Sequence, residues 1–167
     1  MAAQPSRPQR GGVDGGGRTS APRSHARATW VVLLVAWVCF MWGHSLVPGP
    51  ASTAESDRVA LLLRGLFAWL GVGDHAVVTF VVRKAAHFLE YAVMGLLLRK
   101  ALGPGRRAAW LALALAIPSA DEAIQLFVPG RSSSPRDVAI DFAGALTGLG
   151  VCILLEGLRA RRARRTP

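Results

Sequence analysis

The sequence predicts an all-α integral membrane protein, a bundle of four transmembrane helices with an extra amphipathic helix lying on the membrane interface. Hydrophobic residues make up 51% of the 167 residues and charged residues only 18%, a balance unlike that of an ordinary soluble domain. Apolar stretches of roughly 20 residues recur, the length a helix needs to cross a hydrocarbon core about 30 Å thick. Lys and Arg flank these stretches in short blocks, as topology signals do.

The first 28 residues are rich in Gly, Pro, Ser and Arg and contain almost nothing that could pack a core, so they predict a disordered basic tail. A transmembrane domain is expected over residues 29–158, followed by a basic tail over residues 159–167. The first helix is expected at residues 29–47. A cleaved signal peptide, with small residues near 51–54, is the alternative, but the apolar run is long and rich in Trp for that role.

Residues 56–73 are apolar but short, and they carry Arg58 and Arg64. They predict an amphipathic helix on the outer interface, with Ser56 as its N-cap and Trp69 at the depth of the lipid headgroups. A fifth membrane span is the alternative for this segment.

Three further apolar segments, at about residues 84–102, 108–128 and 137–158, complete the bundle, because backbone exposed to lipid must be helical. Pro118 is expected to break or kink the second of these helices. Ser134 and Pro135 suit the N-cap and the first position of the last helix. Gly144 and Gly148 of that helix form a surface of small residues that lets a neighbouring helix approach closely.

The distribution of Lys and Arg predicts the orientation of the bundle. The first tail carries 5 of them, residues 99–107 carry 4 and the last tail carries 5, whereas the segments expected on the opposite side carry 6. Both termini are therefore expected in the cytoplasm. The net charge of +10 resides in these blocks, and no aromatic-basic motif indicates nucleic acid. Cys39 and Cys152 lie in apolar runs without a Cys-x-x-Cys pair, which argues against a disulfide framework or a cysteine zinc site.

Polar side chains, which are costly inside a bilayer, recur at helical spacing on three of the expected helices near the same membrane face. If these stripes converge, the polar groups satisfy one another. The loop residue Arg131 is placed to pair with Glu122 or Asp137. Asp121 adjoins the stripe and can equally face the headgroups. The predicted ligand-binding residues are His87, Tyr91, Glu122, Gln125, Arg131, Asp137 and Asp141.

Three stretches carry a resemblance to a known family: KAAHFLEY (84–91), EAIQLFVPGRSSSPRD (122–137) and DFAGALTG (141–148), with WGHS (42–45) before them. Together they resemble the VanZ-like family of small bacterial membrane proteins over roughly residues 30–156. That family often has an Asp before the Lys of its second helix, where this chain has Arg83. The resemblance implies a place in the bacterial cytoplasmic membrane and a link with low-level resistance to glycopeptide antibiotics of the teicoplanin type. It implies no established biochemical activity.

The favoured hypothesis is a non-enzymatic binder of an amphipathic molecule at the outer leaflet. A membrane lipid, a lipid-linked wall precursor and a lipidated glycopeptide all have this form, with Arg131 gripping a phosphate or carboxylate and acyl chains in the helical grooves. The alternatives are a membrane-embedded hydrolase or transferase using His87 with Glu122 or Asp137, a small transporter, and a purely structural polar network. No nucleophile-elbow or HExxH motif supports an enzyme. A metal held by His87 and carboxylates is chemically allowed, but the sequence defines no ligand set, so no cofactor is predicted.

Overall fold

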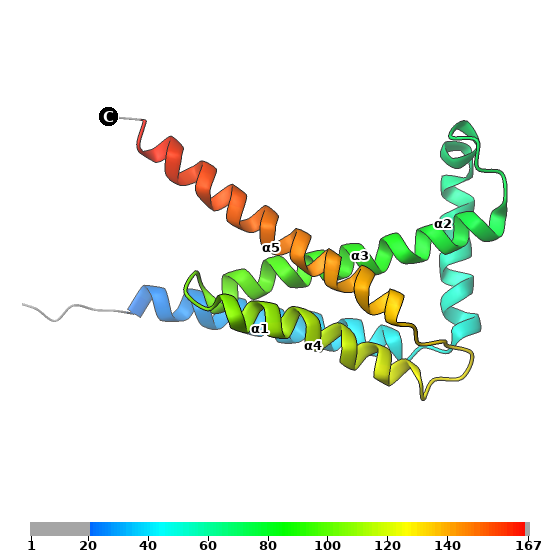
Figure 1. Cartoon of the computed structure of the whole chain (residues 1–167), viewed down its shortest axis with the longest axis horizontal. Coiled ribbons are helices and arrows are strands. Elements are labelled where there is room, and N and C mark those ends of the chain that lie inside the picture. The colour runs from blue at the N-terminus through cyan, green and yellow to red at the C-terminus, as the bar shows by residue number, and fades with distance from the viewer. Residues whose placement is uncertain (1–20, 166–167) are drawn as a thin grey trace, which may run out of the picture.

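A computed structural model describes residues 21–165, with side chains from His25 onward. All regular structure in this range is helical, as the sequence predicts (Figure 1). The five helices are α1 (Ala21–Ser45), α2 (Gly49–Trp69), α3 (His75–Leu102), α4 (Arg107–Gln125) and α5 (Pro135–Ala163). Of the tail expected over residues 1–28, residues 1–20 lie outside the described range, and residues 21–28 belong to α1.

Four helices, α1, α3, α4 and α5, run between two ends of the molecule, and α2 crosses one of these ends (Figure 1). The two ends of the described chain and the α3–α4 turn lie on the same side of the molecule, with the end of α5 splayed away from the other two, opposite the α1–α2 connection and the α4–α5 loop. Within the described residues, two helices are long and apolar enough to cross a membrane, α1 from His25 and α5. The bundle of four spans therefore stays a prediction.

The amphipathic helix α2 begins at Gly49, seven residues before the expected start. Pro48 is its N-cap residue, and Ser56 lies inside the helix, where its hydroxyl donates to the Ser52 carbonyl oxygen at 3.1 Å. The predicted Ser56 cap is therefore wrong, because a proline in the first turn already fixes helical backbone geometry and starts the helix earlier. Trp69 ends α2 with 81% of its surface exposed.

Glycines bring α3 and α5 into close contact. A Cβ atom on Gly148 would lie 1.7 Å from the Ala92 carbonyl oxygen, and one on Gly144 would lie 2.3 Å from that of Phe88. Gly95 of α3 meets α5 in the same way. The predicted role of Gly144 and Gly148 is confirmed, and α3 is the helix that approaches them.

Among the remaining features, one agrees with the local sequence signals and two do not. α5 starts as predicted, with Pro135 in its first turn and the Ser134 hydroxyl accepting from the Arg136 backbone N–H at 3.2 Å. α3 starts at His75 rather than residue 84, because the Asp74 carboxylate caps it by accepting from Ala76. α4 continues through the buried Pro118 to Gln125, so Pro118 does not break the helix, and the alternative of a kink stays a prediction.

The apolar core joins all four lengthwise helices around Tyr91, Met94 and Leu98 of α3. Toward the end that holds the chain termini, Glu156 of α5 accepts from Arg99 at 2.5 Å and from Lys100 at 2.8 Å. The polar cluster described next lies on the other side of this core, near α2 and the α4–α5 loop.

Candidate functional site

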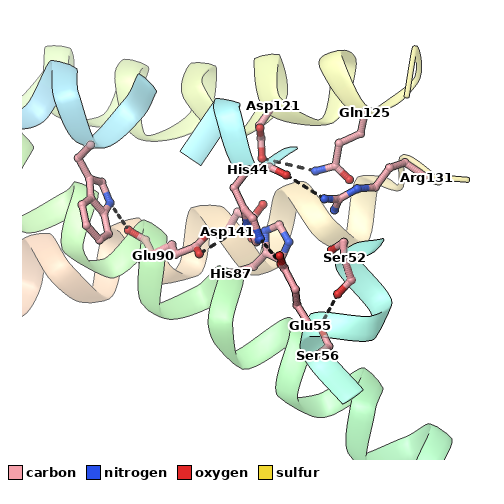
Figure 2. A network of polar contacts seen from close by, with 11 residues as sticks. His44, Ser52, Glu55, Ser56, His87, Glu90, Asp121, Gln125, Arg131 and Asp141 are labelled. Carbon is pink, nitrogen blue, oxygen red and sulfur yellow. Dashed lines mark hydrogen bonds and ion pairs between the residues drawn. The ribbon is translucent and has the colours of Figure 1, made fainter. Parts of the chain in front are cut away.

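The three polar stripes meet in the interior of the bundle (Figure 2). His87 of α3, Asp121 of α4 and Asp141 of α5 each offer one donor atom, and these atoms all lie within 4.8 Å of one another. Asp121 and Asp141 are each only 1% exposed. The alternative that Asp121 faces the headgroups is therefore wrong, because its side chain points into the bundle.

A small cavity of about 10 Å³ opens beside this trio. That volume is about one water-sized probe, so the cavity admits a single water and no lipid headgroup. Most of the predicted ligand-binding residues surround it, together with two cations. The lining consists of Arg83, Lys84, His87, Glu122, Gln125, Asp137 and Asp141.

The acidic groups around the small cavity have separate partners. Asp137 forms an ion pair with Lys84 at 2.5 Å, so Lys84 finds its carboxylate on α5 although Arg83 replaces the family's Asp. The Glu122 carboxylate accepts from the Ser134 backbone N–H at 3.0 Å, at the start of α5. Among the described residues, no hydrogen bond or ion pair joins His87 to Glu122 or Asp137, the two carboxylates considered for it in the enzyme alternative. The carboxylate beside His87 is Asp141, with 4.0 Å between His87 Nδ1 and Asp141 Oδ1.

Several buried polar atoms of the cluster have no hydrogen-bond partner among the described residues: Asp121 Oδ1, Asp141 Oδ2 and the Tyr91 hydroxyl. The Gln125 amide donates one long bond to the other oxygen of Asp121 at 3.5 Å, and the hydroxyls of Ser45 and Tyr91 lie beside the same carboxylate. Tyr91 is fully buried, at 0% exposure. An unsatisfied buried polar group costs about 1–3 kcal/mol, and more when it is charged. The cluster is thus incomplete within the protein alone.

The sequence suggested that Arg131 pairs with Glu122 or Asp137, but in the structure it pairs with neither. Its guanidinium donates to two backbone carbonyl oxygens, that of His44 in the last turn of α1 and that of Val47 just after the helix, both at 3.0 Å. Burial lowers the pKa of this guanidinium from its ordinary value, and it stays protonated at neutral pH. The preceding residue, Gly130, has a φ of +72°. In the same loop, the Pro129 carbonyl oxygen accepts a hydrogen bond from the Gly49 backbone N–H at 3.0 Å. Arg131 therefore fastens the α4–α5 loop to the α1–α2 connection.

A larger cavity of about 390 Å³ lies between α2 and α3. At one place polar side chains gather: His44 Nε2 lies 3.1 Å from Glu55, and His44 Nδ1 lies 3.9 Å from Glu90 (Figure 2). His87 lines this cavity as well as the small one. The rest of the lining is mainly apolar and comes from Val59, Leu63 and Phe67 of α2 and Val81, Val82, Ala85, Ala86 and Leu89 of α3.

Sequence reasoning did not include His44, Glu55 or Asp121 in the site. The WGHS stretch at the end of the first helix was one available signal for His44, since a histidine beside the membrane face invites a polar partner. Glu55 carried no such signal, because its proximity to His44 depends on the turn between α1 and α2.

The family model described as VanZ/LLP1 matches residues 30–156, more than three quarters of the chain. Comparison with curated proteins and with solved structures gives no match.

Proposed function

The chain belongs to the VanZ/LLP1 family, and from that premise we propose that it is a multi-pass protein of the bacterial cytoplasmic membrane that binds an amphipathic lipid-like molecule at the outer leaflet without catalysis. The observation that carries the proposal is the cavity of about 390 Å³ between α2 and α3. This volume falls in the range of small-molecule sites, about 300–1,000 Å³.

The chemistry of the cavity changes along α2, as an amphipathic ligand requires. Its lining residues on α2 recur on one helical face and pass from polar to apolar toward the C-terminus: Ser52, Glu55, Ser56, Val59, Leu63 and Phe67. An acyl chain fits the half that ends at Phe67. A polar headgroup fits the half where His44, Glu55 and Glu90 meet, with Arg83 as the cation of the lining.

The position of α2 supports the same proposal. It crosses the end of the bundle (Figure 1), and large apolar side chains remain exposed along it, among them Leu62 at 85% and Trp69 at 81%. A helix with exposed apolar residues of this kind is suited to the boundary between headgroups and acyl chains. A cavity beneath it is then open to lipid from the side of the membrane.

Arg131 has a different part in this proposal from the one that the sequence suggested. Because its fork is engaged by the His44 and Val47 carbonyls, it positions the His44 end of the cavity instead of gripping a phosphate. The proposed ligand agrees with the family's link to teicoplanin-type resistance, because a lipoglycopeptide and a lipid-linked wall precursor each carry an acyl chain like that of a membrane lipid.

The hydrolase or transferase alternative loses its proposed orienting residues, since Glu122 is bonded to Ser134 and Asp137 to Lys84. A purely structural network accounts for those two pairs. It does not account for an apolar cavity with a polar end.

The test is native mass spectrometry of the detergent-purified protein, which counts retained lipid. Ala86→Trp puts an indole into the cavity and is expected to remove the bound lipid. Leu62→Trp, on the exposed side of α2, is the matched control and should retain it. A wild-type protein that carries no lipid-like molecule, or an Ala86→Trp variant that keeps it, would overturn the proposal.

A further inference from the structure

We propose that His87, Asp121 and Asp141 form a binding site for one divalent transition metal ion, with Zn²⁺ as the probe. The three residues come from three helices, and their donor atoms lie within 4.8 Å of one another. One imidazole nitrogen and two carboxylate oxygens are donors that Zn²⁺ and its neighbours accept. This site is independent of the lipid cavity proposed above, although His87 borders both.

The distances are close to those that coordination needs. With bonds of about 2.0–2.1 Å, the ligand atoms of a tetrahedral site lie about 3.4 Å apart. The separation between His87 Nδ1 and Asp141 Oδ1 is 4.0 Å. No pair of donors is farther apart than 4.8 Å, so each must approach by at most about 1.4 Å, a shift that side-chain rotation can supply.

Charge gives the second, independent argument. Asp121 and Asp141 are each 1% exposed, yet neither forms an ion pair with a Lys or Arg in the described part of the chain. Of the nearby cations, Lys84 is paired with Asp137, and Arg131 donates to backbone carbonyls and forms no ion pair with Asp121, so its single charge offsets the two carboxylates only in part. Two buried carboxylates without a cation are costly, and one divalent ion neutralises both.

The unsatisfied atoms indicate where an ion would sit. Asp121 Oδ1 and Asp141 Oδ2 are buried without a hydrogen-bond partner, as is the Tyr91 hydroxyl. Both His87 and Asp141 also border the cavity of about 10 Å³. Three protein ligands together with space for one water form the pattern of a metal site with one open coordination position.

A pair of protonated carboxyls is the competing explanation, and substitution separates the two. Asn mimics a protonated Asp in shape and hydrogen bonding but cannot neutralise a cation. If the carboxyls are simply protonated, Asp141→Asn is silent and metal content is zero throughout. If the ion is bound, Asp141→Asn abolishes metal uptake.

The experiment measures Zn²⁺ content by mass spectrometry after loading and desalting of the full chain in detergent. The wild type should retain about one ion per chain, and EDTA should lower its melting temperature. His87→Gln and Asp141→Asn should lose the ion. The matched controls are His75→Gln and Asp57→Asn, which change the surface pair His75–Asp57 at 3.4 Å and should keep it. A wild type without Zn²⁺, or equal uptake by all variants, overturns the proposal.

A gain-of-signal variant keeps the test decisive if the loss variants fail to fold. His87→Cys replaces one ligand by another, so the Co²⁺-loaded variant should acquire a thiolate charge-transfer band in the near ultraviolet. His75→Cys should not, and the wild type, with Cys39 and Cys152 present, supplies the background. Absence of the band in a folded His87→Cys variant excludes residue 87 as a ligand. Loss of metal with lipid retained, or the reverse, separates this site from the lipid cavity.

Discussion

Replacing Arg131 by Ala should destabilise the protein, because this side chain joins two segments that are distant in the sequence. Its guanidinium donates to Val47 O and His44 O at 3.0 Å each, from a partly buried position. Hydrogen bonds to charged groups contribute about 1.5–3 kcal/mol each. With the lower figure, appropriate to partial burial, the loss is about 3 kcal/mol of the free energy of unfolding.

The conservative substitution tests the geometry of the clamp. Arg131→Lys keeps the charge but lacks the planar fork that reaches both carbonyls, so it should recover at most about half of the loss. Arg136→Ala is the matched control, since Arg136 lies in the first turn of α5 with an exposed side chain, and it should change stability by less than about 0.5 kcal/mol.

The assay is reversible unfolding in mixed micelles, followed by far-ultraviolet circular dichroism. Arg131→Ala should unfold at a lower denaturant fraction than the wild type, with Arg131→Lys between them and Arg136→Ala beside the wild type. If Arg131→Ala and Arg136→Ala unfold together, the two carbonyl bonds contribute nothing, and the role of Arg131 as a clamp is refuted.

Two further predictions follow from the helix packing and from the topology. Gly148→Ala should lower the free energy of unfolding by about 1–3 kcal/mol, because its Cβ would lie 1.7 Å from the Ala92 carbonyl oxygen and must push α3 and α5 apart. In the control variant Gly150→Ala, on the same helix, the added Cβ meets nothing within 4 Å, so stability should be unchanged or higher by up to about 1 kcal/mol. Equal melting temperatures of the two variants would contradict the close approach of the helices. Reporter fusions at Gly103 and at the C-terminus should both report a cytoplasmic location, because the α3–α4 turn and the end of α5 lie on one side of the molecule and carry basic residues. Opposite locations for the two fusions would exclude the four-span arrangement.

The all-α class, the approximate location of every helix and the family could all be predicted from the amino-acid sequence. These depend on signals that are local or periodic: runs of apolar residues, and caps such as Ser134 beside Pro135. Gly144 and Gly148 also predicted a close helix contact, although not that α3 is the helix that makes it. The exact helix ends were less accurate, since Asp74 and the first-turn residue Pro50 set the starts of α3 and α2 earlier than hydropathy alone suggested.

The partners of the polar residues depend on how the helices pack, which no local pattern encodes. Helical spacing predicted that His87, Asp121 and Asp141 lie near one membrane face, but whether Asp121 points outward or into the bundle depends on the rotation of α4. Arg131 illustrates the same limit: its position beside Glu122 and Asp137 suggested an ion pair, yet its acceptors are carbonyls of the α1–α2 connection, more than 80 residues away in the chain. Backbone carbonyls are present at every residue, so no sequence pattern marks the ones that a folded chain leaves free beside a guanidinium.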